Sequence, residues 1–242
     1  MSQDKHLLTD PASACRAAAD CIAGLLNDAL ERQPSASLAV SGGRTPAAMF
    51  DSLAVASGLD WSRVHLFFVD ERAVPPDHEQ SNYGMTLKRL IEPASIPPPN
   101  VHRIAGELPP HESARRYGHD IRALFGFSDQ ELPRFDVIQL GVGADGHTAS
   151  LFPGDPYLEN RESLAAAVYA ESVSQWRVTL LPGVLLAAKQ LVVLACGEAK
   201  AEPLWRAWHG EPDPMRCPAQ LIAREATCAE WFLDLAAAAK LL

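Results

Sequence analysis

Short apolar segments alternate with longer segments of helical periodicity along this chain, and this alternation constrains the fold more than any other feature. The apolar segments are "SLAV" (37–40), "VHLFFV" (64–69), "FDVIQLGV" (135–142) and "QLVVLACG" (190–197). Continuous apolar runs of this length are typical of strands that are buried on both faces, as in parallel sheets. Strands that alternate with helices form right-handed β-α-β units. The sequence therefore predicts an α/β, Rossmann-like fold with a mainly parallel sheet flanked by helices on both faces.

The remaining segments fit one domain that spans residues 1–242. A long helix is expected from Pro11 to near Pro34, and the last helix is expected over 228–242 with Thr227 as its N-cap. Further strands are expected at 163–170, 176–182 and 218–223. Further helices are expected after Thr45, over 81–95, over 111–126, after Pro182 and over 198–210. Pro203 is expected to interrupt the last of these helices. The proline-rich stretch 93–112 is not Gly/Ser-rich, so it is expected to be an ordered surface connection within the domain.

Composition excludes several classes of function. Lys and Arg total 21 against 30 Asp and Glu, a net charge of -9, which argues against a nucleic-acid-binding protein but allows a few local cations to hold one small anion. The chain has no apolar run long enough for a membrane-spanning helix and no signal-peptide pattern at its N-terminus. The five cysteines include no C-x-x-C pair, which favours reduced thiols in a cytoplasmic protein. No H-E-x-x-H motif is present, and no metal or cofactor is expected.

Glycines follow the first apolar segment in "SGGRTP" (41–46). In α/β proteins ligands bind where the strands end, and consecutive backbone N–H groups at a helix start form a nest for anions. Ser41 and Thr45 are expected to add hydroxyl donors. The segment is not a Walker A loop. On local grounds it also fits an ordinary strand-to-helix turn that Thr45 caps.

A polar cluster ends the second expected strand. Asp70, Glu71 and Arg72 are consecutive, and Ser81 or Asn82 is expected to cap the helix that follows. One interpretation is a solvated cluster of ion pairs. The other is a binding site in which Arg72 contacts a phosphate and a carboxylate contacts sugar hydroxyls. Spacing alone does not decide between them.

The third strand end carries "GVGADGHTASLFPG" (141–154), whose first three glycines have the G-x-G-x-x-G spacing of a dinucleotide-binding loop. That motif requires a helix directly after the loop and an acidic residue about 20 positions on that ends a second strand, and this sequence fits neither requirement. A tight turn explains part of the glycine pattern. It does not explain why Asp145 and His147 flank Gly146 beside a strand end, which favours a catalytic loop.

Taken together, these segments resemble the 6-phosphogluconolactonase family, whose superfamily also contains glucosamine-6-phosphate deaminases and sugar-phosphate-sensing domains of transcription regulators. The resemblance covers most of the chain. In chain order the matching segments are "SGGRTP" (41–46), "DERAVP" with "SNYG" (70–75 and 81–84), "GVGADGHTASLFPG" (141–154), and "RVTLLPGVLLAAK" with "GEAKAEPL" (177–189 and 197–204).

The resemblance implies an ester hydrolase of the oxidative pentose phosphate pathway that converts 6-phospho-D-glucono-1,5-lactone into 6-phosphogluconate without cofactor or metal. It suggests His147 as the general base, and imidazole titrates near neutral pH. Asp145 is too close in sequence for us to expect a direct bond to His147, so we expect it to orient the site or the substrate hydroxyls. Backbone N–H groups of the 141–147 loop are expected to stabilise the oxyanion.

The only expected partner is a phosphorylated sugar lactone, and the protein is expected to bind it mainly through its phosphate group. Two of its expected contacts, Arg177 and Lys200, are carried over from the family pattern. The full set of expected substrate-binding residues is Ser41, Gly42, Gly43, Arg44, Thr45, Asp70, Arg72, Asn82, Gly143, Arg177 and Lys200. The family often has serine where this chain has Arg44, so the contacts of that position are not carried over.

Two other functions stay open. In the deaminases the pattern continues after the histidine toward a glutamate, whereas this chain has no carboxylate between His147 and Asp155, which favours the lactonase. The other alternative is a non-catalytic sugar-phosphate-sensing module. Such regulators carry a DNA-binding domain ahead of the sugar domain, and only about 35 residues are expected before the first strand here.

Overall fold

The computed structural model describes residues 2–56, 58–126 and 131–242. Its strands are β1 (Ser2–Leu8), β2 (Ala36–Val40), β3 (Val64–Phe68), β4 (Asp70–Arg72), β5 (Val101–His102), β6 (Val137–Leu140), β7 (Ala165–Ala170), β8 (Gln175–Leu180), β9 (Gln190–Ala195) and β10 (Cys228–Asp234). Its α-helices are α1 (Pro11–Arg32), α2 (Arg44–Ala54), α3 (Asn82–Thr86), α4 (Pro110–Phe125), α5 (Pro182–Ala187) and α6 (Ala201–His209). Two π-helical turns, Leu87–Ile91 and Leu221–Glu225, and several short 3₁₀ turns complete it.

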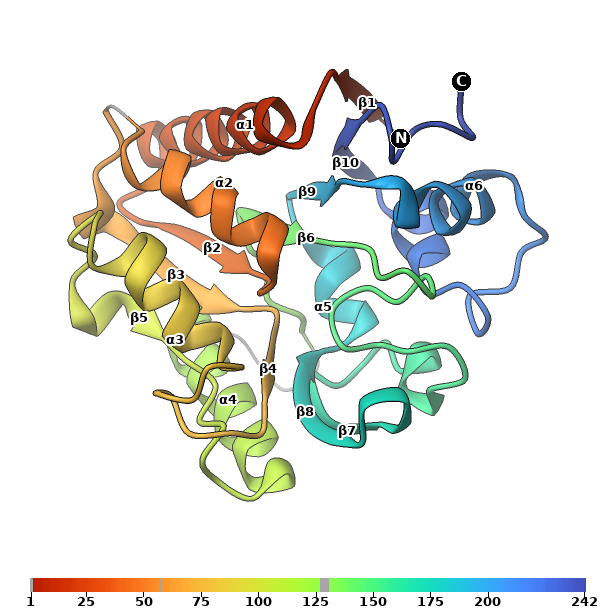
Figure 1. The fold of residues 1–242 in the computed structure, drawn as a ribbon. Coiled ribbons are helices and arrows are strands. Elements are labelled where there is room, and N and C mark those ends of the chain that lie inside the picture. The colour runs from red at the N-terminus through yellow and green to blue at the C-terminus, as the bar shows by residue number, and fades with distance from the viewer. Residues whose placement is uncertain (1, 57, 127–130) are drawn as a thin grey trace.

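Seven of these strands form one parallel sheet in the order β1-β10-β9-β6-β2-β3-β5. In Figure 1, α1 and α2 lie above this sheet and α4 and α5 lie below it. Every residue of β2 and β6 is buried, because helices cover both faces of the central strands. The predicted α/β class is therefore confirmed. In the part of the chain that the structure describes, no helix combines the length and the apolar character needed to cross a membrane.

A second, three-stranded sheet in the order β4-β8-β7 stands beside the large one. The strands predicted at 163–170 and 176–182 exist as β7 and β8, but they are antiparallel and lie outside the parallel sheet. The reason is their connection, which is a short turn through Ser174 at a positive φ of 48°. Parallel neighbours would need a crossover of a dozen or more residues.

Val69 joins the two sheets. Its N–H donates to the carbonyl of Val40 in the large sheet, and its carbonyl accepts from Leu180 N–H in the small sheet. The chain therefore passes from β3 directly into β4, and Asp70 pairs with Thr179 across the small sheet. This transfer places the 70–72 segment at the edge of the small sheet, directly after the end of β3.

Two predictions about the C-terminal part are wrong. Residues 228–234 form strand β10 and not a helix, because they pair with β1 on one side and β9 on the other, with residues 231–234 buried. The alanine-rich stretch after them had suggested the helix. Residues 218–223, predicted as a strand, lead into the π-helical turn. The sequence prediction also missed β1, which is the first strand of the chain and begins at Ser2.

Two helical predictions concern prolines. Pro203 does not interrupt α6, because it occupies the first turn, where backbone N–H groups have no partner within the helix. Helix α1 begins at Pro11, as predicted, and the side chain of Asp10 caps it by accepting from Ser13 N–H at 2.8 Å. It ends at Arg32, just before Pro34.

Tyr117 of α4 completes the edge of β3, because β5 is too short to do so. β5 pairs with Leu66 and Phe67 only. The buried Tyr117 hydroxyl donates to the Phe68 carbonyl at 2.7 Å and accepts from the Phe68 N–H at 2.9 Å. One hydroxyl thus satisfies both backbone groups where the neighbouring strand has ended.

We expect Tyr117→Phe to lower the free energy of unfolding by about 1–3 kcal/mol, because it leaves buried backbone groups without partners. Urea denaturation should show a lower midpoint with an unchanged slope. Tyr169→Phe is the matched control, since the Tyr169 side chain is exposed, and it should change stability by less than about 0.5 kcal/mol. Equal midpoints for Tyr117→Phe and wild type would contradict the proposed bridge.

Candidate active site

A cavity of about 500 Å³ opens where the strands of the large sheet end, beside the small sheet. Its lining brings together twelve of the thirteen predicted site residues from four separate segments of the chain. They are Ser41, Gly42, Gly43, Arg44, Thr45, Asp70, Arg72, Asn82, Gly143, His147, Arg177 and Lys200. Asp145 lies outside this lining and faces a neighbouring cavity of about 750 Å³.

The charge of this lining is opposite to that of the whole protein. Arg44, Arg72, Arg177 and Lys200 line the cavity, and Asp70 is the carboxylate among the described lining residues, in a chain of net charge -9. Low-dielectric walls strengthen the field of such a cluster. The cavity therefore favours an anionic ligand over a cationic one.

Burial removes part of the hydration of two of these cations, Lys200 and Arg177. Desolvation lowers the pKa of Lys200 and the charge of Arg44 adds to the effect, while the Asp145 carboxylate opposes it. Desolvation also lowers the pKa of Arg177, against the opposing charge of Asp70. A buried cation gains most from an anionic partner that replaces its lost hydration. Both side chains are suited to hold a phosphate.

His147 and Asp145 form a direct hydrogen bond, with Nδ1 of the imidazole 2.6 Å from Oδ1 of the carboxylate. The expectation that they are too close in sequence for such a bond is wrong. The intervening Gly146 has a φ of 93°, a left-handed conformation that glycine adopts without strain. It turns the chain so that the two side chains meet, and the carboxylate also accepts from the His147 N–H at 3.1 Å.

The carboxylate of this pair stays ionised over the whole working pH range. Burial alone would raise the pKa of Asp145, but the hydrogen bond and charge of His147 outweigh it and hold the pKa at about 2. An ionised carboxylate accepts a hydrogen bond from Nδ1–H, which leaves Nε2 as the basic nitrogen of the ring. The imidazole also packs against Phe152, with ring centroids 4.6 Å apart, and this contact fixes its plane.

Three backbone N–H groups of the 141–147 loop have partners inside the loop. Gly143 N–H donates to the His147 carbonyl at 2.8 Å, and Gly146 N–H donates to the Gly143 carbonyl at 3.1 Å. His147 N–H donates to Asp145. These three groups are therefore not the oxyanion donors that the sequence suggested, because each already has a partner.

Glu71 is a buried residue of β4 whose carboxylate holds the start of α3. Its carboxylate accepts from the N–H groups of Asn82 and Tyr83, both at 2.7 Å, and from the Ser81 hydroxyl at 3.0 Å. Burial raises the pKa of Glu71, and these hydrogen bonds work against that rise. The side chain has no capacity left for a ligand, so it positions Asn82 and does not bind sugar hydroxyls.

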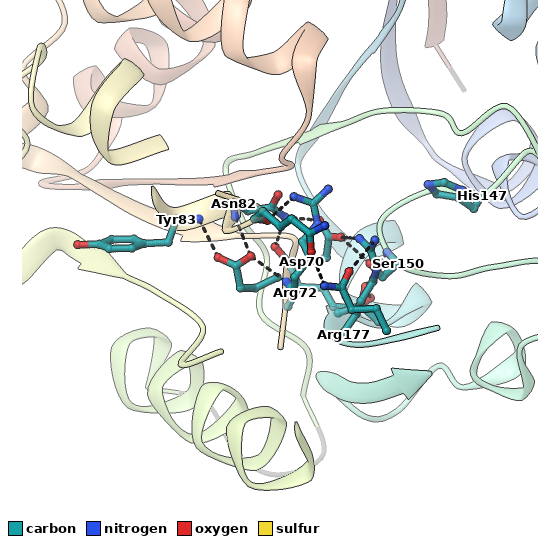
Figure 2. A network of polar contacts seen from close by, with 12 residues as sticks. Asp70, Arg72, Asn82, Tyr83, His147, Ser150 and Arg177 are labelled. Carbon is teal, nitrogen blue, oxygen red and sulfur yellow. Dashed lines mark hydrogen bonds and ion pairs between the residues drawn. The ribbon is translucent and has the colours of Figure 1, made fainter. Parts of the chain in front are cut away.

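Asp70 has a similar internal role. Its Oδ2 accepts from the Ser150 hydroxyl at 2.5 Å and lies 3.9 Å from Nη1 of Arg177. Its Oδ1 accepts from Nδ2 of Asn82 at 3.3 Å. Figure 2 shows this network, with His147 apart from it on the loop that carries Ser150. Asp70 therefore orients a cation of the cavity, as an ion-pair cluster would, but it is buried and not solvated.

Arg72 and Ser41 also differ in detail from their predicted roles. Arg72 donates through Nη1 to the Gln80 carbonyl at 2.7 Å, which fixes its side chain over the loop before α3. The Ser41 hydroxyl donates to the Gln139 carbonyl at 3.1 Å, and Ser41 N–H donates to the Gln139 side chain. The hydroxyl of Ser41 is therefore tied to β6 and is not a free donor for a ligand.

Three buried side chains of the site escaped the sequence prediction: Gln139, Ser150 and Thr179. Gln139 holds the glycine loop, Ser150 holds Asp70, and the Thr179 hydroxyl accepts from Ser150 N–H at 3.1 Å. The partners are far apart in sequence, so no local pattern indicates them. A polar residue inside an otherwise apolar strand, as in "VIQL" and "VTLL", is the one feature that would have pointed to two of them.

Fold and cavity together define a parallel α/β protein with a cationic cavity and a His-Asp pair at the carboxyl ends of its strands. The chain belongs to the family of glucosamine-6-phosphate isomerases and 6-phosphogluconolactonases, whose model matches residues 9–231.

Among its relatives is the 6-phosphogluconolactonase of Haemophilus influenzae, which is 35% identical over 83% of this chain and 85% of that protein. The human 6-phosphogluconolactonase is 40% identical over 77% of this chain and 72% of that protein. The crystal structure of a 6-phosphogluconolactonase from Thermotoga maritima superposes with a TM-score of 0.83 at 29% identity, covering 96% of this chain and all of that one.

Proposed function

We propose that this protein hydrolyses 6-phospho-D-glucono-1,5-lactone to 6-phosphogluconate, the activity that its relatives' names state. The observation that carries the proposal is one cavity lined by four cations and by His147, whose imidazole is hydrogen-bonded to Asp145 outside that lining. The cations suit the phosphate, and the pair suits the deprotonation of water at the lactone carbonyl. We place the whole reaction in the single domain 1–242 and in the cytoplasm, with the sugar phosphate as the small-molecule partner.

In this mechanism Nε2 of His147 takes a proton from water as the oxygen attacks C1 of the lactone. The Asp145 carboxylate keeps Nδ1 protonated and stabilises the imidazolium that forms. The tetrahedral intermediate then collapses, and the imidazolium returns its proton to the leaving ring oxygen. The single product is the opened chain, a carboxylic acid that then loses its proton to water and becomes the carboxylate of 6-phosphogluconate. No step requires a change of oxidation state.

The phosphate supplies positioning energy. It carries most of two negative charges at neutral pH and does not enter a low-dielectric cavity without partners. The 42–45 backbone, at the start of α2, and the side chains of Arg177 and Lys200 are its proposed contacts. Binding at this remote group holds C1 against the water and contributes to the rate.

Arg177→Ala and Lys200→Ala should each raise KM for the phosphorylated lactone by about 10- to 100-fold, as expected for a lost charge-assisted hydrogen bond. The matched control is a second substrate. With unphosphorylated gluconolactone, a poor substrate in every case, the same variants should keep the wild-type kcat/KM. Unchanged KM values in both variants, or equal losses on both lactones, would refute the phosphate contacts.

The activity itself is tested by acid release from freshly prepared lactone, measured above the spontaneous rate, with ammonia release from glucosamine-6-phosphate measured in parallel. The lactonase proposal expects acid and no ammonia. Ammonia release would identify a deaminase. The sequence argues against that activity, because no carboxylate lies between His147 and Asp155. Binding of 6-phosphogluconate without either reaction would identify a sensing module.

A further inference from the structure

Residues 213–220, which we call the brace, hold the loop that carries the catalytic imidazole, although no step of the proposed hydrolysis uses them. Ala219 N–H donates to the Gly146 carbonyl at 2.9 Å, directly before the imidazole-bearing residue. The Met215 carbonyl accepts from Gly154 N–H, at the far end of the same loop, at 2.7 Å. The brace is therefore bonded to the loop on both sides of the imidazole.

The brace packs most closely against Gly146, which forms the turn between Asp145 and His147. A Cβ on this glycine would lie 3.0 Å from Sγ of Cys217 and 3.6 Å from the Cα of the same cysteine. Cys217 is itself buried, with 3% of its surface exposed. Because closely packed groups transmit displacements to one another, a shift of the brace moves the turn that brings the imidazole and the carboxylate together.

One buried side chain, Gln220, fixes the shape of the brace. Only 2% of its surface is exposed. Its Nε2 donates to the carbonyls of Arg206 at 3.0 Å and Glu211 at 2.8 Å, and its Oε1 accepts from Asp213 N–H at 2.7 Å. An amide nitrogen only donates and an amide oxygen only accepts, so these three partners fit one orientation of the side chain. Gln220 thereby ties the first residue of the brace to the last turn of α6.

We propose that Gln220 is a positioning residue for the hydrolysis, because it holds Gly146, and with it the pair of His147 and Asp145, in place through the brace. This inference rests on the proposed function. In the part of the chain that the structure describes, the cavity lining contains no residue of the brace, so Gln220 acts through the loop and not on the substrate. The proposed phosphate contacts lie in other segments. Loss of Gln220 should therefore lower kcat and leave KM nearly unchanged.

Gln220→Met is the first test, because methionine has nearly the same length and no amide. It leaves two carbonyls and the Asp213 N–H without their partner. Since a displacement of about 1 Å costs up to about 100-fold in rate, we expect kcat to fall about 10-fold, with KM within about 2-fold of wild type. Gln220→Glu covers the case in which the methionine variant does not fold. It keeps the acceptor for Asp213 and loses at least one of the two donations, so its kcat should fall less, by about 3-fold.

The matched control is Tyr117→Phe, which also removes buried hydrogen bonds to the backbone but does so at β3. Urea denaturation should show lower midpoints for Gln220→Met and for this control. Only the Gln220 variants should lose kcat at a temperature where all the proteins are folded. If Gln220→Met kept the wild-type kcat, as the control should, Gln220 would be a structural residue and the proposal would be overturned.

Ala219→Pro tests the route, because proline has no N–H to hold the Gly146 carbonyl. Residues that act through one path show non-additive losses. The double variant with Gln220→Met should therefore lose about as much kcat as the more affected single variant. Losses that multiply would show that Gln220 does not act through this hydrogen bond, and the proposed route would be rejected.

A spectroscopic readout does not depend on the reaction. The imidazole ¹⁵N NMR signals of His147, assigned by their absence in His147→Ala, should shift in Gln220→Met and stay in place in Tyr117→Phe. Unchanged signals in Gln220→Met would overturn the positioning role even if the protein is a lactonase. Shifted signals in a protein without lactonase activity would uphold the action of Gln220 on the loop and reject the function.

Discussion

Replacing His147 by alanine should lower kcat/KM for the phosphorylated lactone by about 10²–10⁴-fold, the usual contribution of a general base. The substitution removes the basic nitrogen that the hydrogen bond to Asp145 prepares. It leaves the glycine loop and the four cations of the cavity in place. The loss should therefore appear in kcat, and 6-phosphogluconate should still bind with nearly wild-type affinity.

The matched control is His119→Ala. His119 lies 3.7 Å from Asp120 on α4, and 80% of its side chain is exposed, so it reproduces a His-Asp contact away from the cavity. It should keep full activity. The rate of His147→Ala must be read above spontaneous hydrolysis, since the lactone opens slowly in water. Near-wild-type turnover in that variant would remove His147 from the mechanism.

The layers of the fold were predictable because the strands of a parallel sheet have a local signature. A strand covered by helices on both faces is a nearly continuous apolar run, as in β2 and β6, each of which contains one buried polar residue, Ser37 and Gln139. The same rule explains the failure at Trp231. Most of its strand is buried, but an alanine-rich continuation also favours a helix, and the pairing with the neighbouring strands β1 and β9 decides the outcome.

The sequence predicted which residues line the site, but it did not predict the hydrogen bonds between them. Glycines and charged residues after strand ends indicate a ligand site at one edge of the sheet, and the structure brings His147 and Lys200 into the same cavity. The roles of Asp70 and Glu71 depend on which buried partner each carboxylate meets. Ser150, the partner of Asp70, lies in a different motif, and spacing carries no information about such pairs.

Gly143→Ala should reduce activity nearly as much as the loss of the imidazole, although it changes no functional group. A Cβ at position 143 would lie 2.2 Å from Nδ1 of His147 and 2.6 Å from Oδ1 of Asp145. Both distances are far inside van der Waals contact, so the added methyl must separate the pair. Glycine is therefore required at the second position of "GVGADGH" because a side chain there would collide with the imidazole. The close approach of a dinucleotide is not the reason.

We expect kcat/KM of Gly143→Ala to fall by at least about 10²-fold, the lower end of a general base's contribution, with binding of 6-phosphogluconate changed far less. Gly24→Ala is the matched control, because a Cβ there meets nothing within 4 Å. It should keep full activity and raise stability by up to about 1 kcal/mol, since alanine is the better residue inside a helix such as α1. If Gly143→Ala also kept full activity, the hydrogen bond between His147 and Asp145 would have no part in catalysis, because the methyl group cannot be accommodated while that bond remains.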